Sequence, residues 1–235
     1  MTIPQRTRQL LLAATIGVAS LGAYALLIEP RWLKVSHTRI RVPTLPAALT
    51  GDFATDYASS FDAVLDILAC LDAPLGVYAV PGNHDYRVGI DTWQRQFTAA
   101  QGIINLTNQA LIRRVDGTRL CIAGVDDFSR GTPRPEVLPP AEQRDFTILL
   151  AHNPDQAEHL QGTDDRVDLI VSGHTHGGQV RLPWIGALRN PAHHDDLYEE
   201  GLQQRPWAQV YVSRGIGTVS LPVLRELVES WQRAA

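Results

Sequence analysis

The chain has 235 residues, enough for one sizeable α/β domain with an N-terminal appendage but too few for two full enzymatic domains. Its hydrophobic content of 44% and charged content of 20% are ordinary for a folded protein. A net charge of −4 gives no electrostatic indication of a nucleic-acid partner, so the composition predicts one globular domain and names no substrate.

The N-terminal region combines a basic segment over residues 1–9 with an uncharged apolar run over residues 10–28. Because about 20 apolar residues in a helix span a bilayer, the run predicts a transmembrane helix. A cleavable secretory signal is an open alternative. A buried core helix is a third reading, which the scarcity of polar residues in the run argues against. Basic residues flank both ends of the run, so the orientation in the membrane stays open.

Residues 29–50 carry Pro30, Pro43 and Pro46 among scattered basic residues. Proline cannot donate to a sheet ladder, so this composition predicts a tether or an edge strand that leads into the globular domain. We place that domain over residues 51–222.

Inside the domain, the spacing of apolar residues alternates between the helical and the strand period. The predicted elements are a helix over 59–71, a strand over 76–80, a helix over 90–100, two strands over 110–115 and 119–125, a strand over 147–151, a short helix over 155–160 and a strand over 167–172. The Asp116-Gly117 pair tolerates the positive φ angles of a tight hairpin turn. This alternation predicts a layered α/β domain. Residues 223–235 have helical spacing and predict a C-terminal helix or tail.

Four polar clusters follow strand-like segments of this domain. They are Gly51-Asp52, Gly82-Asn83-His84-Asp85, Ala151-His152-Asn153 and Gly173-His174-Thr175-His176-Gly177-Gly178. A single histidine after a strand is more often structural than a ligand, but open α/β sheets hold their ligands at strand ends, and here four clusters share that position. Together they predict a functional site.

The donor types in these clusters indicate a metal. Carboxylate, amide oxygen and imidazole together suit Mn, Fe(II) or Zn, and cysteine is missing from the clusters. The candidate ligands are Asp52, Asn83, His152, His174 and His176.

In this order, the four clusters resemble the second to fifth motifs of the calcineurin-like metallophosphoesterases. The surrounding sequence, residues 74–85 and 172–183, is similar to the bacterial branch whose members often carry an N-terminal membrane segment. The resemblance implies a sandwich of two mixed β-sheets flanked by helices, with two divalent metals at the strand ends. Together with the apolar run over residues 10–28, it predicts a protein anchored in or exported across a bacterial membrane; the side of the membrane stays open, and export fits both the anchor and the signal readings of the run.

The resemblance also implies roles for individual residues. Asp52 would bridge both metals, Asn83, His152 and His174 would complete the second site, and His176 would belong to the first. His84, oriented by Asp85, would stabilise charge on the scissile phosphate or protonate the leaving oxygen. Two cations would activate water for in-line attack.

One motif of the family is missing. No Asp or Glu lies between Glu29 and Asp52, so the early Asp-x-His that supplies two ligands to the first metal is absent. A βαβ unit takes about 30 residues, so an N-terminal portion of that kind is expected to be lacking. Asp52 and His176 alone are few ligands for the first metal, so the site is expected to hold one or two metals.

These observations predict a metal-dependent hydrolase of phosphodiester or pyrophosphate bonds, with a lipid-linked substrate as one option. The alternative is a degenerate, non-catalytic family member that binds metal or phosphate. Arg214 is a further candidate, either as a bidentate donor to a substrate phosphate or in a surface ion pair. His193-His194-Asp195-Asp196 is interpreted as a solvated loop, because adjacent side chains rarely converge on one ion.

Overall fold

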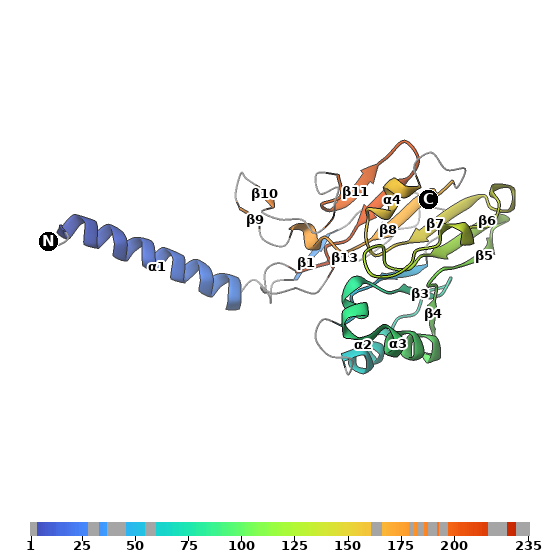
Figure 1. The fold of residues 1–235 in the computed structure, drawn as a ribbon, viewed down its shortest axis with the longest axis horizontal. Helices are drawn as coiled ribbons and strands as arrows, with labels where there is room; N and C mark the ends of the chain where they lie inside the picture. Colours follow the sequence, from blue (N-terminus) through green and yellow to red (C-terminus); the bar gives the residue numbers. More distant parts are fainter. Residues whose placement is uncertain are drawn as a thin grey trace.

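The computed structural model describes residues 4–27, 33–36, 46–54, 60–160, 166–178, 181–182, 186–187, 192, 197–215 and 225–228. Within these residues the fold is an α/β sandwich of two sheets, with helices on its outer side (Figure 1).

The larger sheet has six strands. Their spatial order is β11 (Gly201–Gln204), β12 (Gln209–Val212), β8 (Leu169–Ser172), β7 (Phe146–Leu150), β6 (Thr118–Gly124) and β5 (Gln109–Val115). The central strands β12, β8, β7 and β6 are parallel, and the two edge strands are antiparallel to their neighbours. The carboxyl ends of the central strands therefore meet at one edge of the sheet.

The smaller sheet has three parallel strands. It consists of β2 (Ala47–Thr50), β3 (Val77–Val80) and β4 (Ile103–Asn105), with β3 in the middle. The helices α2 (Ser60–Leu68) and α3 (Asn83–Ala99) follow β2 and β3 in the chain, and they lie beside this sheet in Figure 1. Two further strand pairs are β9 (Arg181–Leu182) with β10 (Gly186–Ala187), and β1 (Leu33–Ser36) with β13 (Arg225–Val228).

Apolar side chains from both sheets form the central core. Tyr78 and Val80 of β3 belong to one buried cluster with Ile122, Ile148 and Leu169 of the larger sheet. Strand residues alternate between faces, so each sheet also presents a second apolar face.

Those second faces are covered by helices and loops. On the smaller sheet, Trp93 and Phe97 of α3 stack with their ring centroids 4.6 Å apart, and both are fully buried with Phe61 of α2. On the larger sheet, the short helix α4 (Gln156–His159) contributes Ala157 to a separate cluster. Each sheet is thereby packed on both of its faces, which fixes the positions of its strand ends.

The predicted elements of the domain are confirmed, with shifted ends. The hairpin β5–β6 turns at Asp116 and Gly117, whose φ angles are 49° and 85°, as the dipeptide predicts. Helix α3 begins at Asn83, seven residues before the predicted start, because Gly89 (φ 147°) breaks the periodicity on which the prediction relied. Residues 47–50 form the edge strand β2, one of the two forms expected for residues 29–50.

The two ends of the chain differ from the predictions. The apolar run belongs to α1 (Gln5–Leu27), which extends away from the sheets in Figure 1. In the described part of the chain, no helix is both long and apolar enough to cross a bilayer, so the predicted transmembrane helix over 10–28 is not supported. The C-terminal helix is wrong for residues 225–228, which form β13 because they pair in parallel with β1. The predicted segment boundaries stay predictions.

Candidate metal centre

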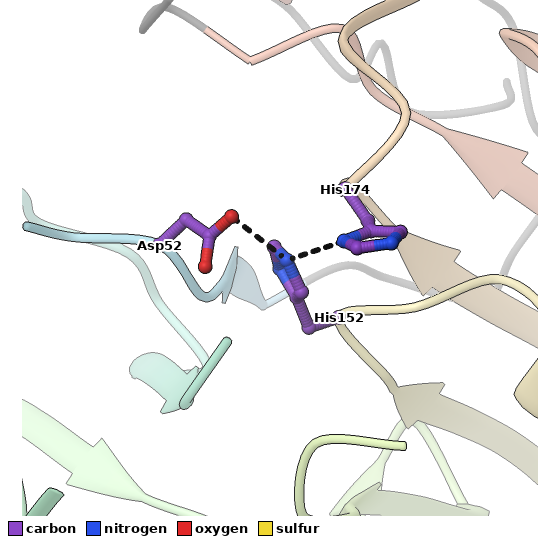
Figure 2. Close-up of side chains that lie close together, drawn as sticks. All are labelled: Asp52, His152 and His174. Carbon is purple, nitrogen blue, oxygen red and sulfur yellow. Dashed lines mark hydrogen bonds and ion pairs between the residues drawn. The ribbon is translucent and has the colours of Figure 1, made fainter. Parts of the chain in front are cut away.

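The candidate centre lies where strand ends of the two sheets meet. His152 follows β7 and His174 follows β8, while Asp52 follows β2 and Asn83 follows β3. Figure 2 shows Asp52 and His174 on either side of the His152 ring. We call His152 and His174 the histidine half of the centre, and Asp52 and Asn83 the oxygen half.

The turns that carry these ligands need unusual backbone angles. Asp52 (φ 58°) and His174 (φ 70°) are non-glycine residues in the left-handed region, a conformation that clusters at functional sites. Gly51 (φ 74°) precedes Asp52, and a Cβ there would lie 2.5 Å from the Gly82 nitrogen and 2.6 Å from His152 Nδ1. Only glycine fits at position 51, because the two strand-end loops touch there.

The orientation of His152 follows from one hydrogen bond. Its Nδ1 lies 2.5 Å from the carbonyl oxygen of Thr50 and can interact with it only as a donor. In the neutral ring, the lone pair is then on Nε2, which points into the centre.

Four electron-pair donors converge on that point. His152 Nε2 lies 3.0 Å from Asp52 Oδ2, 3.2 Å from Asn83 Oδ1 and 3.3 Å from His174 Nδ1. His174 Nδ1 is in turn 2.9 Å from Asn83 Oδ1. One proton on Nε2 can satisfy only one of these neighbours well.

A divalent cation would satisfy all four donors at once. Ligand atoms held about 2.1 Å from one ion lie about 3.0 Å apart in octahedral and about 3.4 Å apart in tetrahedral coordination, which is close to these separations. Asp52, His152 and His174 each offer an atom within 4.8 Å of the other two. The residues therefore fit a metal such as Mn, Fe(II) or Zn, with Asn83 as a fourth ligand.

Charge in the centre also favours a cation. Burial alone would raise the pKa of Asp52, but His152 outweighs it and holds that pKa well below its ordinary range. Burial would lower the pKa of His152, but the Asp52 carboxylate raises it to about 9. Burial and then the charge of His152 lower the pKa of His174 to about 4. Without a metal the site thus retains a proton on His152, which a cation would replace.

The expected partnership of Asp85 with the His84 ring is corrected. Both oxygens of Asp85 accept backbone N–H groups, from Gly82 and from the Asp52 loop, because the carboxyl group is enclosed beneath them. Among the described residues, the buried Nδ1 of His84 has no hydrogen-bond partner. Burial raises the pKa of Asp85 to about 7, with the Gly82 N–H acting in the opposite direction.

The remaining candidates lie apart from the four ligands or outside the described residues. His176 is half-buried in a turn (φ 52°) and does not join the cluster of Asp52, His152 and His174, so its role as a ligand of the first metal stays a prediction. Arg214 pairs with Glu200, as the ion-pair alternative predicts, and packs against Gly177. Residues 193–196 lie outside the described residues.

A fifth strand-end cluster was missed. Asp126 and Asp127 follow β6, beside the β7 loop that carries His152, and both are buried. Tyr86 of α3 donates to Asp126 at 2.7 Å, and the Asp127 charge acts on His152 in the direction that raises its pKa. The signal was the Val125-Asp126-Asp127 sequence after a predicted strand. The absence of the early Asp-x-His motif was inferred from the sequence of residues 30–51, and it stays a prediction.

Together, the sandwich and the buried donor cluster define an α/β protein with a metal centre at its strand ends. Residues 45–178 match the family model described as calcineurin-like phosphoesterase, and the chain belongs to this family. The predicted family and fold are thereby confirmed, and membership implies divalent metal ions.

Two curated relatives are similar over most of the chain. An uncharacterized metallophosphoesterase, YkuE of Bacillus subtilis, is 36% identical over 178 residues, covering 74% of this chain and 61% of the relative. The phosphodiesterase YaeI of Escherichia coli is 33% identical over 175 residues, covering 73% of this chain and 63% of the relative. The match thus covers less than two thirds of either relative's length.

Proposed function

We propose that this protein hydrolyses phosphoester bonds with a divalent metal held by Asp52, Asn83, His152 and His174. Two observations support this proposal. His152 Nε2 lies 3.0–3.3 Å from the donor atoms of the other three residues, and His174 Nδ1 lies 2.9 Å from Asn83 Oδ1. When bound, the metal would activate a water molecule and neutralise phosphoryl oxygens.

The residues of the chain supply orientation and proton transfer. Thr50 O holds the His152 ring with Nε2 toward the metal, and His84 N–H donates to Asp52 Oδ1 at 2.8 Å, which directs Asp52 Oδ2 toward the same point. The side chain of His84 is close enough to Asp52 for its charge to lower the pKa of that carboxyl. With Nδ1 unpartnered among the described residues, His84 is our candidate for protonating the leaving oxygen.

We further propose a phosphodiester as the substrate. The support is similarity to a relative named a phosphodiesterase. A pyrophosphate bond is the alternative substrate, and a lipid-linked substrate is a narrower form of either. Export from the cytoplasm and the choice among Mn, Fe(II) and Zn stay separate predictions.

The test is turnover of bis(p-nitrophenyl) phosphate by the purified protein. We expect turnover to disappear with chelator and to return with Mn²⁺, and elemental analysis to find at least one metal per chain. Metal-dependent thermal stability without turnover of diesters or pyrophosphates would instead support the non-catalytic alternative. Removal of metal without any change in stability or turnover would contradict both.

A further inference from the structure

The carboxylate of Asp85 joins two segments that are distant in the chain. Oδ2 accepts the N–H groups of Asp52 and Gly82, each at 2.8 Å. Oδ1 accepts those of Phe53 at 2.8 Å and Ala54 at 3.2 Å. Three of the four donors belong to the loop after β2, whereas Asp85 is on the first turn of α3. Each oxygen therefore serves two donors, and the fully buried carboxylate connects the loop to the helix.

The connection is reciprocal. While Asp85 accepts the Asp52 N–H, Asp52 Oδ1 accepts the N–H of His84 at 2.8 Å. These bonds hold Asp52 at φ 58°, a strained conformation that a non-glycine residue keeps only where its surroundings impose it. The Asp52 carboxylate is thus left with Oδ2 directed toward His152.

The same bonds join the two segments that carry the candidate oxygen ligands. Asn83 lies two residues before Asp85 on α3, and Asp52 lies in the loop that Asp85 holds. We infer that Asp85 is a positioning residue, which holds the segments of Asp52 and Asn83 in the arrangement a metal requires and acts through backbone N–H groups. This inference rests on the proposed function, since it assumes a metal at the centre.

The substitution Asp85→Asn tests the inference. It preserves the size of the side chain but replaces one oxygen by an NH₂ group that must face two N–H donors. We expect Mn²⁺ affinity, measured by calorimetry, to fall about 10–100-fold, the usual effect of losing a residue that orients metal ligands. The electron paramagnetic resonance spectrum of the remaining bound Mn²⁺ should change, and kcat should fall more than KM rises.

The matched control is Asp168→Asn. Asp168 is also largely buried, and it accepts the Thr147 N–H at 2.8 Å, but it lies immediately before β8, at the opposite end of the strand from His174. This variant should melt at a lower temperature than the wild type and bind Mn²⁺ with unchanged affinity. If Asp85→Asn does not fold, Asp85→Ser, which retains one small acceptor, should show the same loss of affinity.

The outcomes separate the inference from the proposed function. Wild-type protein that binds Mn²⁺, with an Asp85 variant that binds it equally tightly, would overturn the positioning role alone. Wild-type protein that binds none of Mn²⁺, Fe²⁺ and Zn²⁺ would overturn the proposed function and the inference together. Loss of affinity in the Asp85 variant but not in Asp168→Asn supports both.

Discussion

The histidine half and the oxygen half of the centre are positioned in different ways. His152 and His174 follow neighbouring parallel strands, and the ladder continues past the strand ends because the Gly173 N–H donates to the His152 carbonyl at 3.0 Å. Asp52 and Asn83 also follow neighbouring strands, β2 and β3, but their loops are joined by the carboxylates of Asp52 and Asp85. Sheet register therefore places the histidines, whereas side-chain hydrogen bonds to the backbone place the oxygens.

The largest effect is expected from the histidine half. His152→Ala should reduce phosphodiester turnover by more than about 100-fold, beyond the range for residues that only orient ligands, because it removes a ligand atom. His159→Ala is the control, since His159 is exposed on α4 and contacts Phe128. Turnover and metal content are measured for both variants. Full activity in His152→Ala would show that the centre lies elsewhere.

Next comes the helix layer that supports the oxygen half. Trp93→Ala should lower the free energy of unfolding by about 3–5 kcal/mol, since it removes a fully buried aromatic ring stacked on Phe97. Ile67→Ala on α2 should change it little, because Ile67 is 70% exposed. Denaturant unfolding measures both variants. Equal losses would contradict the packing described for this layer.

A smaller effect on the free energy of unfolding is expected from two glycine substitutions, which distinguish backbone strain from steric overlap. Gly51 and Gly117 both have positive φ, but a Cβ at Gly117 would meet nothing within 4 Å, whereas at Gly51 it would overlap backbone and the His152 ring. Gly117→Ala should lower the free energy of unfolding by about 1–2 kcal/mol through strain alone. Gly51→Ala should lower it further and also weaken Mn²⁺ binding. If Gly51→Ala bound Mn²⁺ with normal affinity, the close approach of the Asp52 loop to His152 would not be needed to hold the oxygen half and the histidine half together.

The smallest effect concerns pH. The Asp52 carboxylate raises the pKa of His152 to about 9 in the folded protein, compared with about 6.5 in the unfolded chain. The pairing therefore contributes its full stability to the metal-free protein below pH 6.5, and that contribution is lost as the pH rises through 9. Melting temperature of chelated protein should therefore fall between pH 7 and 10 by more than that of His152→Asn. Saturating Mn²⁺ should remove this difference, since the bound ring is neutral. An identical pH profile for wild type and variant would refute the pairing.

Local sequence features predicted much of the fold. The strand and helix periods located α2, α3, α4 and the strands β3, β5, β6, β7 and β8, and Asp116-Gly117 identified the hairpin, because both signals depend on nearby residues. The three-residue strand β4 was not predicted. The β13 strand was not predictable, since its backbone partner is β1, at the opposite end of the chain. The candidate ligands Asp52, Asn83, His152 and His174 were named from strand-end clusters and family resemblance.

The sequence by itself determined which side chains could bind a metal and that they follow strands of an α/β domain. Only the tertiary structure decided how they are held. The role of Asp85 illustrates the difference: the family resemblance implied His84 as its partner, but the backbone N–H groups of Gly82 and of residues 52–54 are its actual partners. Such bonds depend on the approach of the β2 loop to α3, which packing of the two sheets and helices establishes and no local pattern encodes.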